Sequence, residues 1–206
     1  MTEHYYTVEP GSAHRPKEIV VKLRGQELRL QTDAGVFSRQ RLDPGTKLLV
    51  ESLELSGVEA PLDLGCGYGP IGLVIARERP DVTVYMSDLN RRATELAAEN
   101  AAQNGLGNVV IRQGDAFLPW QDLYTAGFRF DLVAMNPPLR AGKETVLRLF
   151  AEARDRLRPG GQLWAVIRTK QGAKTYLREL ERIFGTAETA AIKSGYRVLL
   201  ARKQPD

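Results

Sequence analysis

The sequence predicts a doubly wound α/β fold built around a mostly parallel sheet. From about residue 58, short apolar runs alternate with segments of helical periodicity, a pattern typical of strands joined by crossover helices. The runs are apolar through most of their length, as expected for strands covered by helices on both faces. A glycine-rich turn, Gly65 to Gly69, follows the first run, where such sheets commonly bind ligands.

The segment before this core predicts an N-terminal β-hairpin and a short helix. Residues 18–32 alternate in polarity and can turn at Arg24-Gly25. Asp43-Pro44 then opens a helix over 45–55, with Asp43 as the N-cap and Pro44 in the first turn. We therefore expect a single domain over 1–206, divided into a weakly ordered tail (1–17), the hairpin and helix (18–57), and a catalytic α/β core (58–206).

The core predicts seven apolar runs as strands and four helices between them. Pro80 and Gly105 end two of the helices, since neither residue continues a helix well. Ser194-Gly195 joins the last two strands as a hairpin, so the final strand should run antiparallel. The expected strands cover 58–65, 82–88, 108–115, 130–136, 162–168, 186–192 and 195–202, and the helices 70–80, 91–105, 142–161 and 173–185.

Composition narrows the class further. The 206 residues are 43% hydrophobic and 26% charged, which suits one globular domain. No apolar run approaches the ~20 residues of a membrane span, and the N-terminus lacks a secretory signal, so we expect a soluble, cytoplasmic protein. The single cysteine, Cys66, excludes an internal disulfide, and with only two histidines no zinc site is expected. The net charge of +4 favours a nucleic-acid partner only slightly.

The glycine-rich turn is the first candidate binding element. Glycines let the backbone turn with positive φ and approach a ligand closely, and Asp63 stands just before them. The stretch 67–72 also fits the G-x-G-x-x-G pattern of dinucleotide binders, which alone is weak. A carboxylate beside the turn suits a ligand with an ammonium or sulfonium group better than a pyrophosphate. A tight turn without a ligand is the alternative.

Two more carboxylates follow the next two strands. Asp88, with Leu89, stands where an acidic side chain can accept both hydroxyls of a ribose; alternatively it competes with Asn90 to cap the following helix. Asp115, with Ala116 beside it, can accept a hydrogen bond from an adenine amine. For Asp115 the alternative is a plain loop carboxylate.

Asn136-Pro137-Pro138 directly follows the fourth core strand and decides the chemistry. Two prolines end the strand and stiffen the loop. The Asn136 side-chain carbonyl and the Pro137 backbone carbonyl can then hold both N–H groups of a planar amine and aim its lone pair at an electrophile. The alternative is a strand-terminating turn with no catalytic role.

These motifs together resemble the amino-methylating class I S-adenosylmethionine methyltransferases. With residues 33–38 (DAGVFS), the chain more closely resembles the small-subunit ribosomal RNA methyltransferase C group, which are guanine-N2 enzymes, over nearly all of 18–203. The resemblance implies a seven-stranded Rossmann-like sheet and S-adenosylmethionine as cofactor. It places Phe37 over the site and Asn136 and Pro137 on the target amine. The implied cofactor-binding residues are Asp63, Gly65, Cys66, Gly67, Tyr68, Gly69, Asp88, Leu89, Asp115, Ala116 and Asn136.

Two departures from the family pattern matter. The larger members carry a second, N-terminal methyltransferase-like domain that this chain has no room for, so we expect another source of substrate grip, such as a homodimer. Leu139 stands where adenine-N6 and glutamine-N5 enzymes usually place an aromatic. Phe37 or Trp120 must then supply any platform on which a base stacks.

Basic residues near the motif suggest how RNA is held. Arg140 and Lys143 follow Asn136, and Arg168 and Lys170 end the next strand, so all four could meet phosphates. A solvated loop rim is the equally weighted alternative. We thus expect catalytic residues Asn136, Pro137 and Pro138 and substrate-binding residues Phe37, Leu139, Arg140, Lys143 and Lys170.

The function predicted from the sequence is methylation of a guanine exocyclic N2 amine in small-subunit ribosomal RNA, by an enzyme that uses S-adenosylmethionine and no metal. Methylation of a protein glutamine amide is the nearest alternative. A nicotinamide-dependent oxidoreductase would leave Asn136-Pro137-Pro138 without a task. A non-catalytic RNA-binding module on the same fold is the third alternative, and the intact Asp63, Asp88 and Asn136 argue against it.

Overall fold

The computed structural model describes residue 8 and residues 12–205. Seven strands form one sheet in the order β5-β4-β3-β6-β7-β9-β8, and β1 and β2 form a separate hairpin. The sheet is parallel except at β9, which runs antiparallel to both β7 and β8. The strands are β1 Lys17–Leu23, β2 Gln26–Thr32, β3 Pro61–Leu64, β4 Val84–Asp88, β5 Val109–Gln113, β6 Phe130–Met135, β7 Leu157–Arg168, β8 Ala187–Lys193 and β9 Tyr196–Arg202.

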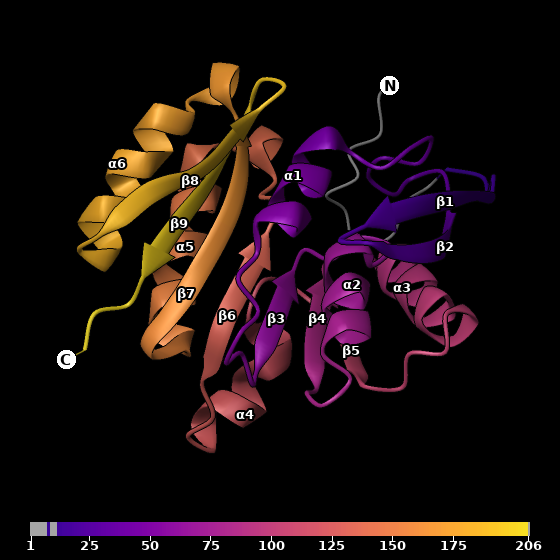
Figure 1. Ribbon diagram of the computed structural model, residues 1–206, viewed down its shortest axis with the longest axis horizontal. Helices are drawn as coiled ribbons and strands as arrows, with labels where there is room; N and C mark the ends of the chain where they lie inside the picture. Colours follow the sequence, from indigo (N-terminus) through magenta and orange to yellow (C-terminus); the bar gives the residue numbers. More distant parts are fainter. Residues whose placement is uncertain (1–7, 9–11, 206) are drawn as a thin grey trace.

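Helices cover both faces of the sheet (Figure 1). Two buried apolar clusters correspond to the two faces: α1, α2 and α3 contribute to one, and α5 and α6 to the other. β6 alternates between them, with Leu132 on one side and Val133 on the other. This confirms the doubly wound, mostly parallel fold. The helices are α1 Pro44–Ser52, α2 Pro70–Glu78, α3 Arg91–Gln103, α4 Gln121–Thr125, α5 Lys143–Arg156 and α6 Ala173–Phe184, with short 3₁₀ turns at Leu118–Trp120, Leu139–Ala141 and Thr169–Gln171.

The strand order places a binding crevice at the carboxyl ends of β3 and β6. The chain passes from β3 to β4 and β5 on one side, then crosses to β6 on the other side of β3. At such a switch point the loops after adjacent strands diverge and leave room for a ligand. The glycine-rich turn follows β3 and Asn136 follows β6, so both motifs lie at this crevice.

The N-terminal hairpin is bonded to the core through α3. Its turn at Arg24-Gly25 has two positive φ angles, 47° and 76°, as the sequence predicted. On α3, Asn100 accepts from the backbone N–H of Gln31 at 2.6 Å and donates to its carbonyl at 3.0 Å. Asn104 makes the same pair of bonds to Arg29. The two asparagine side chains bond to the backbone of β2 as a neighbouring strand would, and they hold the N-terminal hairpin against the core.

Two helix ends and one connecting segment differ most from those expected. The helix expected over 142–161 ends at Arg156, and β7 begins at Leu157; Pro159 has no N–H and disfavours the helical region for Arg158. The helix expected over 45–55 ends at Ser52. The segment between β5 and β6, expected as a loop, contains α4 and a 3₁₀ turn.

The described part of the expected tail contacts the core. His14 Nδ1 lies 2.6 Å from Oδ2 of Asp33, and the backbone N–H of Arg91 donates to the Val8 carbonyl. β1 begins at Lys17, at the end of the segment expected to be weakly ordered.

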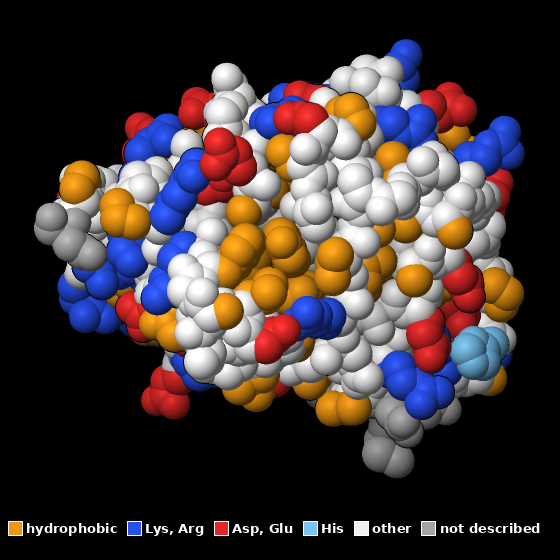
Figure 2. All heavy atoms as spheres, turned by 90° about the horizontal axis from the view of Figure 1, so that it is seen from below, with side chains coloured by type: hydrophobic (Ala, Val, Ile, Leu, Met, Phe, Trp, Pro, Cys, Tyr) orange, Lys and Arg blue, Asp and Glu red, His pale blue; other side chains and the backbone are white. Residues whose placement is uncertain are grey.

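One face of the molecule shows how charge is distributed. In Figure 2 apolar side chains gather near the centre, and Lys and Arg alternate with Asp and Glu around the rim. On this face the net positive charge is spread rather than collected in one basic patch.

None of the helices described here is long and apolar enough to cross a membrane.

Candidate active site

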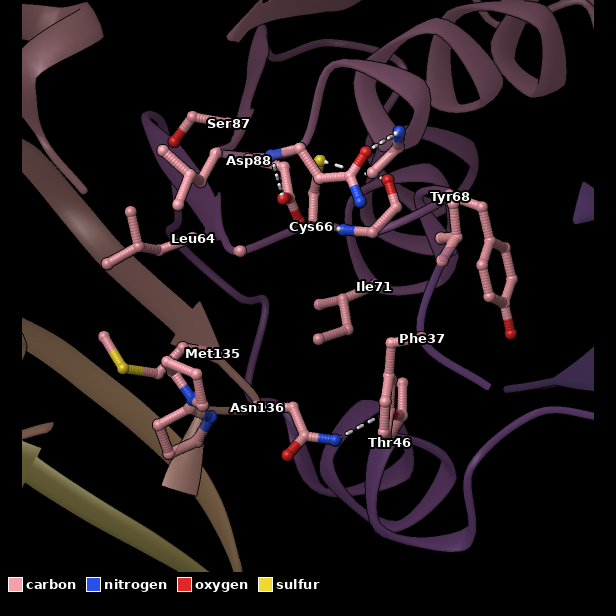
Figure 3. A pocket seen from close by; sticks show the side chains of 18 of the residues that line it. Phe37, Thr46, Leu64, Cys66, Tyr68, Ile71, Ser87, Asp88, Met135 and Asn136 are labelled. Atoms are coloured by element: carbon pink, nitrogen blue, oxygen red, sulfur yellow. Dashed lines mark hydrogen bonds between the residues drawn. The ribbon is translucent and has the colours of Figure 1, made fainter. Parts of the chain in front are cut away.

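A cavity occupies the crevice at the carboxyl ends of β3, β4 and β6, and we call it the central cavity. Its walls come mainly from the loop before α1, the glycine-rich turn, the end of β4, the loop after β5 and the Asn136 loop (Figure 3). Predicted cofactor-binding residues that line it are Gly65, Cys66, Gly67, Tyr68, Asp88, Leu89, Ala116 and Asn136, together with Phe37, Pro137 and Pro138.

Asp88 ties the glycine-rich turn to the end of β4. Its Oδ2 accepts from the Gly67 N–H at 2.8 Å and its Oδ1 from the Asn90 N–H at 2.8 Å. Gly67 has a φ of 57°, which a residue with a Cβ adopts at a cost. Asn90, not Asp88, caps α3, by accepting from the Ala93 N–H. The half-buried carboxylate of Asp88 therefore lines the cavity, and burial raises its pKa.

Asp63 lies behind the cavity wall, not in it. The residue is 0% exposed, and its Oδ2 accepts from the Gly72 N–H at 2.8 Å. Its Oδ1 is buried without a hydrogen-bond partner among the described residues. Burial raises the pKa of Asp63 to about 7, and the neighbouring charge of Asp88 adds to this rise. In this structure Asp63 supports the turn from behind the cavity wall, and its expected contact with a cofactor stays a prediction.

Asp115 and Gly69 also do not line the cavity. Both Asp115 carboxylate oxygens lie 3.2 Å from Nη2 of Arg148 on α5, which draws this side chain toward α5. The neighbouring Gly114 and Ala116 line the cavity in its place. Gly69 precedes α2 with a φ of 96°, so it shapes the turn from behind.

Cys66 lines the central cavity with little exposed surface. It is 3% exposed, and burial raises the pKa of its thiol well above the usual value, with the negative charges of Asp63 and Asp88 adding to the effect. Because the thiolate is the reactive form, this cysteine is held in its unreactive state.

Asn136 has a defined side-chain orientation. Its Nδ2 donates to Oγ1 of Thr46 at 3.0 Å and to Oδ2 of Asp43 at 3.4 Å. Figure 3 shows the amide nitrogen directed at Thr46 and the oxygen on the opposite side. Both amide hydrogens are thereby used, and none of the described residues donates to Oδ1. This oxygen is an available acceptor where two cavities meet.

The two prolines hold this loop in a compact turn. The Pro137 carbonyl accepts from the Leu139 N–H at 2.8 Å, and the Pro138 carbonyl from the Ala141 N–H at 2.8 Å. A carbonyl oxygen has two lone pairs, so Pro137 can accept one further hydrogen bond. Asn136 Oδ1 and the Pro137 carbonyl, the two acceptors expected from the sequence, can therefore both accept a hydrogen bond. The Pro137 carbonyl already accepts one, from the Leu139 N–H.

A second cavity adjoins the first, and we call it the side cavity. The residues that line both cavities are Val36, Phe37, Ser38, Asp43, Asn136 and Pro137. The side cavity is lined further by Leu139, Arg140, Arg168, Gln171 and Tyr196.

Of the basic residues expected near the target, Arg140 and Arg168 line the side cavity, whereas Lys143 and Lys170 do not. Lys143 Nζ instead pairs with Glu179 at 2.9 Å. Trp120 is 1% exposed and donates to Ser87 Oγ at 3.2 Å. It therefore cannot stack on a base, and Phe37 is the remaining aromatic of the two that the sequence offered.

The sequence reasoning missed Thr46 and Tyr196, and it assigned Asp43 a capping role only. Asp43 does cap α1, accepting from the Thr46 N–H at 2.9 Å. A signal was present in Gly45, since glycine inside a helix costs about 1 kcal/mol relative to alanine. A Cβ on Gly45 would stand 2.5 Å from the Tyr196 ring, so this glycine marks a close approach between α1 and β9.

The fold and the site define an S-adenosylmethionine-dependent methyltransferase: a seven-stranded sheet with β9 antiparallel, a glycine-rich turn at the switch point and an Asn-Pro-Pro loop facing it. Residues 27–200 match the methyltransferase small domain, and the chain belongs to that family. This membership confirms the enzyme class and cofactor predicted from the sequence, and it favours them over a nicotinamide-dependent oxidoreductase.

Relatives that are similar in sequence over most of this chain include a ribosomal RNA methyltransferase. The chain is 41% identical to the YbxB protein of Bacillus subtilis, over 98% of this chain and all of that protein. It is 34% identical to the ribosomal RNA large subunit methyltransferase G of Streptomyces avermitilis, over 83% of this chain and 44% of that protein.

Among solved structures, the chain is similar to the 16S rRNA N2 G1207 methyltransferase RsmC of T. thermophilus, in complex with AdoMet and guanosine. The TM-score is 0.79 and the identity 28%, over 92% of this chain and 51% of that one. The chain thus spans about half the length of the ribosomal RNA methyltransferases it matches and the whole length of YbxB.

Proposed function

We propose that this chain transfers the methyl group of S-adenosylmethionine to the exocyclic N2 amine of a guanine in small-subunit ribosomal RNA. The Asn136 orientation carries the proposal: an amide whose nitrogen is held by Thr46 and Asp43 presents its oxygen to an N–H donor. The central cavity would hold the cofactor, and the side cavity would hold the base. The RsmC structure, which contains both AdoMet and guanosine, supports this assignment.

The chemistry needs orientation more than a base. When bound in the central cavity, S-adenosylmethionine would supply the methyl group and leave as the neutral thioether. The amine nitrogen would gain the methyl and release one proton to solvent. Asn136 Oδ1 and the Pro137 carbonyl would accept hydrogen bonds from the two N–H groups of the amine. Because these N–H groups become more acidic as the methyl transfers, the two hydrogen bonds are stronger in the transition state than in the ground state. Cofactor binding would fall to the backbone of the glycine-rich turn and to Asp88 for the ribose hydroxyls.

The direct test is mass spectrometry of ribosomal RNA from cells with and without the gene, mapped to a nucleotide. The proposal expects one N2-methylguanine in the small-subunit RNA to disappear when the gene is deleted and to return with the purified enzyme and S-adenosylmethionine. A lost mark in large-subunit RNA would correct the subunit. A lost methyl group on a glutamine of a protein, with all RNA marks intact, would contradict the guanine target.

Phe37 is the expected stacking platform in the side cavity. Replacing it with alanine should raise KM for RNA about 10- to 100-fold, because stacking of a base on an aromatic side chain contributes ~1–3 kcal/mol. Phe37→Tyr keeps the ring and should stay near wild type. Steady-state kinetics at saturating S-adenosylmethionine measure the effect, and an unchanged KM in Phe37→Ala would place the base elsewhere.

Arg140 is exposed at the side cavity and is expected to contact an RNA phosphate. Arg140→Ala should reduce the slope of log affinity against log salt by about 0.7–0.9, the value of one lost phosphate contact. Arg178→Ala, which removes an exposed charge on α6 outside both cavities, should leave the slope unchanged. Fluorescence anisotropy across a salt series separates the two variants, and equal slopes would assign Arg140 to a solvated rim.

A further inference from the structure

Asn136 can act as proposed only if its amide faces one way. Amide oxygen and nitrogen have nearly the same shape, and a rotation of 180° would present N–H donors to a target that is itself a donor. The backbone does not select between these two orientations, because both leave the loop unchanged. The selection must come from groups that contact the amide nitrogen, and in this structure those groups are Thr46 and Asp43.

We propose that Asp43 and Thr46, at the start of α1, are positioning residues that set the Asn136 amide with its oxygen toward the target amine. This inference rests on the proposed function. An ionised carboxylate can only accept hydrogen bonds, so Oδ2 of Asp43 selects the donor end of the amide. Rotation of the amide would place Asn136 Oδ1 against that carboxylate oxygen and break the 3.0 Å bond to Thr46 Oγ1.

Asp43 is itself held on both oxygens. Oδ2 accepts from the Thr46 N–H at 2.9 Å, and Oδ1 accepts from the Tyr196 hydroxyl at 3.2 Å. Arg168 Nε in turn donates to that hydroxyl at 2.9 Å. Asp43, Thr46 and Tyr196 are all buried. A carboxylate bonded on both sides cannot turn to release the amide, so its position is passed directly to Asn136.

The network joins three distant parts of the chain. α1 supplies Asp43 and Thr46, the loop after β6 supplies Asn136, and β9 supplies Tyr196. Gly45 makes the junction possible, because the Tyr196 ring occupies the space of a Cβ there. The start of α1 is therefore part of the catalytic arrangement.

Thr46→Val and Thr46→Ser form the first matched pair. Valine keeps the shape and removes the Oγ1 acceptor, whereas serine keeps the hydroxyl. We expect kcat to fall about tenfold or more in Thr46→Val, the equivalent of a lost hydrogen bond in a charged network, with the Kd for S-adenosylmethionine unchanged, and kcat to stay near wild type in Thr46→Ser. Equal kcat in the two variants, with equal Tm, would overturn the role of Thr46.

Asn136→Asp and its combination with Asp43→Asn form the second pair. In N136D two carboxylates stand where an amide nitrogen and a carboxylate lie 3.4 Å apart, so one proton must be shared between them. Activity should therefore be low at pH 8 and rise as the pH falls. In the D43N/N136D double variant only one carboxylate remains, and the amide oxygen at position 43 can still accept from the Thr46 N–H, so the rise in activity at low pH should disappear. A double variant with the same pH dependence as N136D would overturn the role of Asp43.

The outcome can be separated from that of the proposed function. If the wild-type enzyme methylates an amine other than guanine N2, the same kcat comparisons are made on that substrate. If it methylates none, the proposed function fails, and orientation is read from the side-chain amide resonances of Asn136, assigned by their loss in Asn136→Ala. Positioning predicts that Thr46→Val moves these resonances and Thr46→Ser does not. Unmoved resonances in Thr46→Val would contradict it.

Discussion

Asn136→Ala is expected to lower kcat for methyl transfer by about 10²- to 10³-fold, the usual effect of removing one preorganised hydrogen-bond partner of a transition state. The Oδ1 acceptor would be lost, and the amine would keep only the Pro137 carbonyl, which already accepts from the Leu139 N–H. Single-turnover kinetics with purified ribosomal RNA or subunits measure the rate constant of the methyl-transfer step without a contribution from product release.

Cofactor affinity is the internal control for this variant. Asn136 lines the central cavity, but its amide nitrogen bonds only to Thr46 and Asp43 among the described residues. Isothermal titration should therefore give a Kd for S-adenosylmethionine close to that of the wild type. Nearly full kcat in Asn136→Ala would show that the amide does not hold the target amine. Loss of S-adenosylmethionine binding would show instead that Asn136 contacts the cofactor.

Local signals explain why the architecture could be predicted from the sequence. Asp43-Pro44 at the start of α1, Gly105 after α3 and Ser194-Gly195 between β8 and β9 each determine the backbone through contacts within a few residues. The alternation of apolar runs with helical segments then defines a doubly wound sheet. The start of β7 could not be predicted this way, because Leu157 is a strand residue through its pairing with Phe130, far away in the chain.

The candidate site was predictable in its position but not in its contacts. Strand ends at a switch point locate Gly67, Asp88 and Asn136 around one cavity from topology alone. Whether a carboxylate faces the cavity or the interior depends on packing that spacing does not encode. Asp63 is buried because it accepts from the Gly72 N–H in α2, and Asp115 is drawn away by Arg148 on α5. The contacts that orient the Asn136 amide likewise come from α1 and β9, which lie far from Asn136 in the sequence, so spacing could not reveal them.

The free energy of unfolding is expected to fall as the pH rises from about 4 to 7, through a term that Asp63 contributes. Burial raises the pKa of Asp63 from 3.8 to about 7 in the folded protein. Over this range the folded state binds a proton that the unfolded state has released, so stability decreases with rising pH. Three pKa units correspond to roughly 4 kcal/mol as an upper bound, lost in full above about pH 7.

Asp63→Asn isolates this term, because the amide has the same shape and can still accept from the Gly72 N–H. The variant should lack the downward slope, so its stability relative to wild type should improve steadily between pH 5 and pH 8 in urea unfolding experiments. Carboxylates with lowered pKa, such as Glu78 beside Arg24, change stability in the opposite sense and below about pH 5, and they are common to both proteins. Parallel pH curves for the two proteins would mean that Asp63 is ionised in the fold. Its buried Oδ1 would then need a hydrogen-bond donor such as an internal water, because an ionised and unpartnered oxygen in that position is too costly to retain.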